Sequence, residues 1–240
     1  MRNNKKRPSP QTNNGMKDNH YHVIFTEVIP ETQGLWDGAV WQRAQILEVN
    51  CNRPEGSDHR PRTQCRLLYD KQNLYGIFRV EDRYVRCVHT SFQSDVWKDS
   101  CVEFFVQPQD AEGYFNFEFN CGGALLASYV TNPARANGRL QEFVPLTPDD
   151  DGRIRRFAGL PSVVEPEIAG PLVWRLEFSL PLALLAKYAG PFGAVTGQIW
   201  RANFYKCGNE TSHPHWLSWR PLAGRNFHDP SSFGQLVFDP

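Results

Sequence analysis

The stretch YFNFEFN, residues 114–120, places an aromatic side chain at every second position. Successive side chains of a β-strand point to opposite faces. The three phenylalanines therefore share one face, and Asn116, Glu118 and Asn120 share the other. The aromatic face predicts a strand that covers an apolar core. Because alternation is also typical of a strand whose polar face meets only water, this stretch alone leaves open whether that face binds a ligand.

Segments of similar length recur along the whole chain, separated by turn residues. Strand-like runs occupy residues 44–50, 64–70, 74–80, 101–108, 113–120, 124–130, 172–180, 198–206, 215–219 and 233–238. The runs 64–70 and 74–80 flank the short turn KQN and predict a hairpin. Residues 131–160 are rich in Pro, Gly, Arg and Asp, so we expect a long surface loop with one weak strand there.

One segment, PLALLAKYAG at 181–190, has the pattern of a helix. Pro181 suits its first turn, and Gly190 suits its C-terminal end. Many short strands with one short helix predict an all-β fold. We expect an antiparallel β-sandwich with layers like those of jelly rolls or immunoglobulin domains.

Charge and hydropathy exclude several classes of partner. The 240 residues include 26 basic and 26 acidic ones, so the formal net charge is zero. This balance does not favour nucleic acid or an anionic membrane surface as a partner. No apolar run approaches the roughly 20 residues that span a bilayer. We expect a monomer that binds neither nucleic acid nor membrane.

The N-terminal residues and the cysteines bear on the compartment. Residues 1–22 are polar and predict a disordered tail before a folded domain at 23–240. They contain no apolar signal segment, so we expect a cytoplasmic protein, or an extracellular one if the start is truncated. The six cysteines show no C-x-x-C spacing, and we expect them to be reduced and mostly buried. Cys51 and Cys65 would pair only in an oxidising compartment.

Two further strands repeat the pattern of the opening stretch. In WRANFYK, residues 200–206, Arg201, Asn203 and Tyr205 lie opposite an apolar face, and in CVEFFV, residues 101–106, Glu103 does the same. If these strands are neighbours, their polar faces form one patch rich in hydrogen-bonding groups.

Saccharides need such a patch, because each hydroxyl both donates and accepts hydrogen bonds. They also need flat aromatic side chains, on which the C–H faces of a sugar ring pack. Trp97 and Phe227 lie in predicted loops where they would serve as these platforms.

Several motifs together resemble a known family. In chain order they are VWKDSCVEFFV, YFNFEFN, WRLEFSLPL, GQIWRANFYK and FHDPSSFGQLVF, preceded by LLYDKQNLYGIFRVED. This series resembles the family-nine carbohydrate-binding modules and their standalone relatives, over about residues 30 to 240. The resemblance implies a β-sandwich that binds saccharides, often at the chain ends of plant polysaccharides such as xylan or cellulose. It also implies a glycoside hydrolase as a partner, because such modules are commonly attached to xylanases.

The resemblance also implies a set of ligand-binding residues. They are Trp97, Glu103, Glu118, Asn120, Arg201, Asn203, Tyr205 and Phe227. Trp97 and Phe227 match the two stacking positions, and the others match polar contacts. Three positions depart from the family's pattern: Ser100 stands where Asp is usual, Glu118 where Arg is usual, and Phe227 where Trp is frequent. The sugar preference of the xylanase modules therefore does not transfer to this chain.

Some of these residues also fit structural roles. Trp97 would equally close the edge of the sandwich, and Glu103 would pair with Arg201 across two strands. The remaining tryptophans are predicted core residues (Trp36, Trp41, Trp174 and Trp200) or stay undecided (Trp216 and Trp219).

Metal sites have less support. Histidines 213 and 215 with Cys207 lack a recognisable ligand spacing, and we expect no metal there. The family includes calcium-binding members, and Asp82 in RVEDR is the candidate for a structural calcium. No cofactor is required.

Three functions remain at this point. The leading hypothesis is a non-catalytic module that binds a saccharide on the polar sheet face. A glycoside hydrolase would need two carboxyl groups across a cleft, one with a raised pKa. Glu103 and Glu118 are the available pair, but we expect both on a flat face without a pocket to raise either pKa. The third function is a sandwich that binds a protein or another ligand.

Overall fold

Strands make up most of the chain that the computed structural model describes, which is residues 20–136 and 139–240. In the first half they are β1 (His20–Phe25), β2 (Leu47–Val49), β3 (Cys51–Asn52), β4 (Arg62–Tyr69), β5 (Asn73–Asp82), β6 (Val85–Cys87), β7 (Cys101–Gln107) and β8 (Tyr114–Asn120). In the second half they are β9 (Leu125–Ala136), β10 (Arg139–Pro145), β11 (Arg155–Ala158), β12 (Val164–Ile168), β13 (Leu172–Pro181), β14 (Ile199–Cys207), β15 (Trp216–Ser218) and β16 (Gly234–Asp239). The α-helices are α1 (Pro148–Asp151) and α2 (Leu182–Ala189), and the 3-10 turns are η1 (Trp41–Arg43), η2 (Val96–Lys98) and η3 (Pro230–Ser232).

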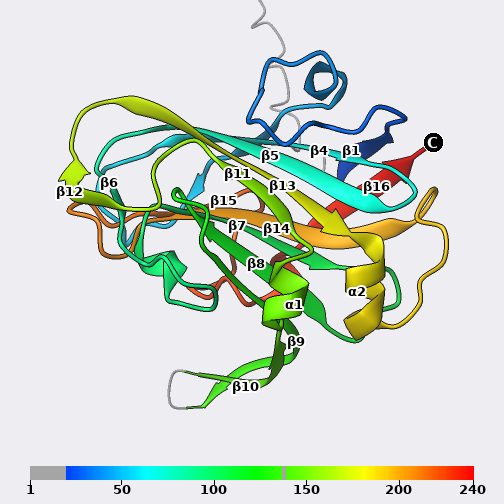
Figure 1. Ribbon diagram of the computed structural model, residues 1–240. Coiled ribbons are helices and arrows are strands. Elements are labelled where there is room, and N and C mark those ends of the chain that lie inside the picture. The colour runs from blue at the N-terminus through cyan, green and yellow to red at the C-terminus, as the bar shows by residue number, and fades with distance from the viewer. Residues whose placement is uncertain (1–19, 137–138) are drawn as a thin grey trace, which may run out of the picture.

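The strands form two layers, which confirms the predicted β-sandwich (Figure 1). One layer has the order β10-β9-β8-β7-β14, and the other has the order β1-β4-β5-β13-β11. Strand β16 pairs with β14 on one side and with β1 on the other, so it joins the layers. Strand β1 is parallel to both of its neighbours, whereas the pairs within the β7–β10 layer are antiparallel.

The apolar faces of both layers meet in one core. Phe104 and Phe119 stack against Phe178 of the opposite layer, with ring centroids 5.8 and 5.2 Å apart. The three phenylalanines of the opening stretch are fully buried in this core, as the alternation predicts. Large buried aromatic side chains make much of the favourable free energy of such a core. The side of β7 and β8 that faces away from the core carries Glu103 and Glu118, beside a smaller apolar cluster that includes Phe105 and Tyr114.

The four tryptophans predicted to be core residues are all buried. Trp174 and Trp200 belong to the main core. Trp36 and Trp41 instead form a second cluster with Tyr75 and its neighbours on β4 and β5.

The region 131–160 is more ordered than its composition suggests. Strand β9 continues to Ala136, and β10 returns beside it as a hairpin that projects from the sandwich (Figure 1). Proline lacks a backbone donor and is confined to edges and bulges of a sheet. The hairpin accommodates Pro133 at such an irregularity, because its register shifts between Leu140 and Phe143. The prediction of a long loop is therefore wrong for this part.

The N-terminal residues, the helix and the cysteines can each be compared with what the sequence predicts. Strand β1 begins at His20, so the last residues of the predicted tail belong to the sheet, whereas residues 1–19 lie outside the described residues. Helix α2 is confirmed at 182–189, and Gly190 ends it with φ +83°.

Five of the six cysteines are buried and all six are free thiols, Cys51 being half-buried. Among the described residues, no helix is long and apolar enough to cross a membrane.

Candidate functional site

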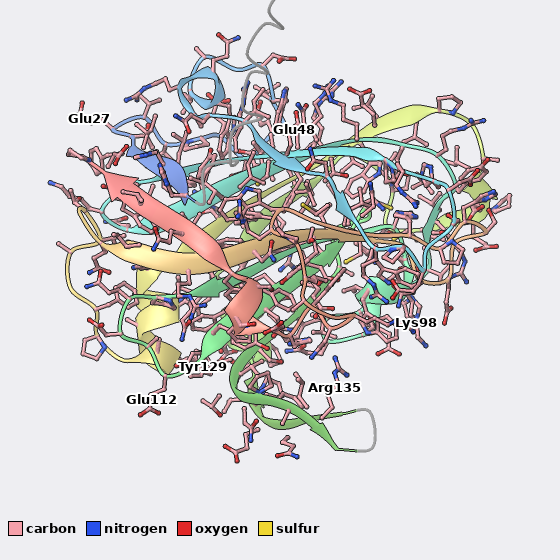
Figure 2. The ribbon with its side chains drawn as sticks, turned by 180° about the vertical axis from the view of Figure 1, so that it is seen from behind. Glu27, Glu48, Lys98, Glu112, Tyr129 and Arg135 are labelled. Atoms are coloured by element: carbon pink, nitrogen blue, oxygen red, sulfur yellow. The ribbon has the colours of Figure 1, made fainter. Side chains whose placement is uncertain are left out.

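A pocket of about 570 Å³ lies over the polar face of β7, β8, β9 and β14. Glu103, Asn116, Glu118 and Ser128 line it from the strands. Loops and the β9–β10 hairpin enclose it, and Figure 2 labels Arg135 on that hairpin. The other lining residues are Arg53, Gln93, Trp97, Leu126, Leu140, Phe143, Pro145, Cys207, Asn209, Trp216, Arg225, Asn226, Phe227 and His228.

Two glutamates stand side by side on the floor of this pocket. Glu103 of β7 lies directly opposite Glu118 of β8 in the antiparallel register, and the residues are only 3% and 5% exposed. The Cys207 thiol donates a hydrogen bond to Glu103 Oε1 at 3.1 Å, and Asn116 Nδ2 donates to Glu118 Oε1 at 2.8 Å. The Asn116 oxygen accepts from the backbone N–H of Ser128, which ties β8 to β9. The floor is thus fixed by the sheet itself.

Burial changes the protonation of both acids. It raises the pKa of Glu118 to about 7, although Asn116 and Arg135 act in the opposite direction. Burial, together with the neighbouring Cys207 and Glu118, raises the pKa of Glu103 well above its usual range. The expectation that these acids lie on a flat face without a pocket is therefore wrong. The loops and the hairpin that enclose them are far apart in the sequence, and no strand pattern shows them.

Three Trp or Phe side chains from outside the β9–β10 hairpin line the pocket, and Phe143 of β10 is a fourth. Trp97 lies in η2, and Phe227 stacks on Tyr205 with ring centroids 4.1 Å apart and planes 10° from parallel. Trp216 is the third, with its indole N–H donating to Asn209 Oδ1 at 2.7 Å and the Arg53 guanidinium 4.8 Å from its ring centroid. Trp216 was undecided from the sequence, because its neighbours in HWLSW do not show which face it takes.

Asn120 holds a loop and does not line the pocket. It is fully buried, and its Nδ2 donates to the His89 carbonyl at 2.6 Å and to Asp99 Oδ2 at 3.0 Å. Its Oδ1 accepts from the backbone N–H of Ala124 at 2.9 Å. Asn120 therefore fixes the segment from His89 to Asp99, which carries Trp97.

The three predicted residues of β14 hold a second loop. Asn203 is fully buried, and its Nδ2 donates to the carbonyl oxygens of Arg220 and Ser232 at 3.2 and 3.3 Å. The Tyr205 hydroxyl donates to the Phe227 carbonyl at 2.9 Å. These contacts position the loop that brings Phe227 to the pocket, while Asn203 and Tyr205 themselves do not line it.

Arg201 is exposed and remote from Glu103. It lies opposite Gln107 in the β7–β14 register, and its guanidinium donates to the Pro230 carbonyl at 2.5 Å. Tyr205 is the residue opposite Glu103. The alternative in which Glu103 pairs with Arg201 across the strands is therefore wrong, because Arg201 lies four positions along β14 from Tyr205, the residue opposite Glu103.

Asp82 lies in a different cluster, at the end of β5. Its carboxylate is 3.4 Å from Lys206 Nζ and 2.8 Å from His59 Nε2, and it accepts from the Trp174 indole N–H at 3.0 Å. Burial opposes its ionisation, but Lys206 and His59 hold the pKa of Asp82 well below its usual range. Calcium takes six to eight oxygen ligands, and these nitrogen partners do not fit it.

Two groups of side chains have the ligand types of a metal site, with ligand atoms within 4.8 Å of one another. The first consists of His59, Asp82 and His215, and the second of Cys101, Glu103 and Cys207. In the first group Lys206 Nζ donates to His215 Nε2 at 2.7 Å, so an ammonium already stands among the ligands. In the second group burial raises the pKa of the Cys101 thiol well above its usual range, which opposes the thiolate that a metal needs.

Comparisons with known proteins bear on the family and the fold of the chain. The family model described as carbohydrate-binding family 9 matches residues 35–238. A protein from Bacteroides uniformis that has been proposed to bind carbohydrate is similar, with a TM-score of 0.78 and 26% identity over 92% of this chain and 99% of that one.

Two structures from Caldicellulosiruptor kristjanssonii have the same fold. The family 9 module with bound glucose has a TM-score of 0.61 and 13% identity, over 92% of this chain and 95% of its own. The cellotriose complex has a TM-score of 0.62 and 14% identity, over 92% and 93%. Comparison with curated protein sequences returns no match.

Proposed function

The chain belongs to carbohydrate-binding family 9, and on that premise we propose that the pocket over β7, β8, β9 and β14 binds a saccharide without transforming it. The observation that carries this proposal is the combination of aromatic side chains with a buried polar floor in one pocket. Trp97, Trp216 and Phe227 supply apolar surfaces for sugar C–H groups, and Glu103, Asn116 and Glu118 supply hydrogen bonds for hydroxyls.

The size of the pocket bears on the length of the ligand. A volume of about 570 Å³ is in the ordinary range for small-molecule sites and suits a monosaccharide or the end of a short oligosaccharide. The glucose and cellotriose in the two Caldicellulosiruptor complexes are ligands of this size. Xylan- and cellulose-derived chain ends are therefore the first ligands to test. Sites of this kind reach about −4 to −8 kcal/mol, which is millimolar to micromolar affinity.

Titration calorimetry with glucose and with cello-, xylo- and manno-oligosaccharides tests the proposal. Trp97→Ala removes one aromatic surface, and we expect it to abolish measurable binding or weaken it at least tenfold. Phe192→Ala is the matched control, because Phe192 is a partly buried aromatic residue that packs on the core and lies outside the pocket. Binding that survives Trp97→Ala unchanged would reject this pocket as the site, and no binding across the panel would favour a sandwich with another ligand.

Hydrolysis is a second candidate, because Glu103 and Glu118 are enclosed together and the pKa of Glu118 is raised to about 7. A carboxyl with such a pKa is a competent general acid. A glycosidase also needs an ionised nucleophile or base on the other side of the scissile bond, whereas here burial raises the pKa of Glu103 as well. Product release, assayed in the same solutions by reducing-end detection, decides between the two. Release that Glu118→Gln abolishes would establish the enzyme.

A further inference from the structure

The two glutamates of the pocket floor form an unusual pair. Residues directly opposite each other in an antiparallel sheet have Cβ atoms about 4.5–5.5 Å apart, and Glu103 and Glu118 occupy such positions while almost fully buried. A carboxylate has room for about four hydrogen bonds. The sheet supplies Cys207 to one oxygen of Glu103 and Asn116 to one oxygen of Glu118. Both acids also line the pocket, so a ligand reaches them.

The titratable groups that act on the pair are two thiols, two phenols, one carboxyl group and one guanidinium. They are Cys101, Cys207, Tyr205, Tyr114, Asp95 and Arg135. Arg135 is the cation in this set, and it comes from an exposed position on the β9–β10 hairpin. Its attraction does not outweigh the burial that keeps Glu118 protonated up to a pKa of about 7.

Two other arginines lie at the pocket but are directed elsewhere. Arg53 Nε is 3.3 Å from Glu55 Oε2, and Arg225 Nε is 2.5 Å from Glu55 Oε1. Glu55 therefore neutralises part of the positive charge at the rim. The ion pairs of Arg53 and Arg225 lead to Glu55 rather than to Glu103 or Glu118.

A ligand ammonium group would compensate the charge of the pair when its carboxyl groups are ionised. Two buried carboxylates side by side repel each other when both are ionised, and a cation between them removes that repulsion. An ammonium also donates three hydrogen bonds, and hydrogen bonds between charged partners are roughly twice as strong as neutral ones. The rings of Trp97, Trp216 and Phe227 add attraction for a cation. A hydroxyl group in the same place carries no charge and gains none of this electrostatic attraction.

We propose that the pocket prefers a saccharide with a free amino group, whose ammonium lies against the carboxylates of Glu103 and Glu118. This inference rests on the proposed function, because it names the class of sugar that the same pocket takes. The amine binds as an ammonium and the pair gives up protons as it does so, whereas glucose and N-acetylglucosamine bring no charge.

Calorimetry with glucose, glucosamine and N-acetylglucosamine, at about pH 6 where the amine is charged, tests the inference. We expect glucosamine to bind about tenfold more tightly than glucose. Titrations in two buffers with different ionisation enthalpies measure proton release, and we expect release with glucosamine and none with glucose.

Isosteric variants locate the effect. Glu118→Gln and Glu103→Gln keep the shape of the floor, and we expect each to bring the ratio of glucosamine to glucose affinity to about one and to remove the proton release. Glu112→Gln is the control, because Glu112 lies outside the pocket (Figure 2). Thermal unfolding of each variant confirms that it is folded.

The outcomes separate the two proposals. If glucose binds and glucosamine binds no more tightly, or if the preference persists in both glutamine variants, the amine inference is overturned and the saccharide pocket stands. If neither glucose, glucosamine nor the oligosaccharide panel binds, the proposed function fails, and this inference fails with it.

Discussion

Asp82 of β5 and Glu103 of β7 are buried acids from different layers of the sandwich, and their surroundings shift their pKa values in opposite directions. Asp82 and Glu103 are each 3% exposed. Asp82 meets Lys206, on the core side of β14, and its pKa falls. Glu103 meets a thiol and a second glutamate on the pocket side, and its pKa rises. The comparison teaches that burial alone does not mark a functional acid. A buried acid with its own cation is part of the fold, whereas one without is available to a ligand.

The largest loss of stability should come from removing Lys206, the cation that pairs with Asp82. Lys206→Met removes a fully buried ammonium and leaves Asp82 as a buried charge with fewer partners. We expect the free energy of unfolding to fall by about 3–5 kcal/mol, measured by urea denaturation. Lys71→Met, at an exposed position, is the control. A loss below about 1 kcal/mol would mean that His59 and Trp174 suffice to hold Asp82.

Lowering the pH should destabilise the folded protein through His215, which belongs to the group around Asp82. Burial, with Lys206 beside it, lowers the pKa of His215 to about 3, against an ordinary value of 6.5. The folded state therefore binds fewer protons than the unfolded state, so stability is lost as the pH falls below about 6.5. We expect His215 to contribute a loss of about 2 kcal/mol between pH 6.5 and 4.5.

Urea denaturation across this pH range checks the contribution of His215, with His215→Gln as the comparison because its side chain does not titrate. The wild type should lose more stability than the variant over the interval. Equal slopes for the two proteins would show that His215 is already charged in the folded state.

Glu118 in the pocket should give stability the opposite dependence on pH. The pKa of Glu118 is raised from 4.5 to about 7, so the folded state binds more protons, and stability is lost as the pH rises from about 4.5 to 7. Glu118→Gln removes this penalty. We expect the variant to be about 2 kcal/mol more stable than the wild type at pH 7, less than the whole shift implies because Asn116 loses a charged acceptor.

A measurement at about pH 4 is the control for Glu118→Gln. The wild-type acid is protonated there, so the two proteins should have nearly equal stability. The matching substitution of the acid that pairs with Lys206, Asp82→Asn, should destabilise the protein at pH 7. If both substitutions destabilise equally, the contrast between the two groups fails.

The sequence predicted the strands better than the pocket, and particular residues show why. Alternation placed Phe117 in the core and Glu118 on the other face, because one period of two residues decides both. Alternation does not show what covers that face. The hairpin with Arg135 and the loop with Trp216 reach the pocket from distant parts of the chain.

Alternation also does not show what the polar residues of β14 contact. Asn203 and Tyr205 lie on the predicted side of the strand, yet their side chains hydrogen-bond to backbone carbonyls of the loop 220–232. An Asn in a strand needs a partner, and the sequence does not tell whether a sugar or a loop supplies it. Such residues position the pocket without touching its floor, and their substitution should have modest effects.

Tyr205→Phe tests this last role and should give the smallest change. It removes the hydrogen bond to the Phe227 carbonyl but keeps the ring that stacks on Phe227. We expect a loss of about 1 kcal/mol in the free energy of unfolding and a two- to fivefold loss in saccharide affinity, because the loop is held less firmly. Tyr75→Phe removes a comparable hydrogen bond, to Asp70 outside the pocket, and should cost similar stability without changing affinity. An affinity loss above about twentyfold in Tyr205→Phe would instead mean that the hydroxyl contacts the sugar, and Tyr205 would then join Glu103 and Glu118 as a ligand-binding residue.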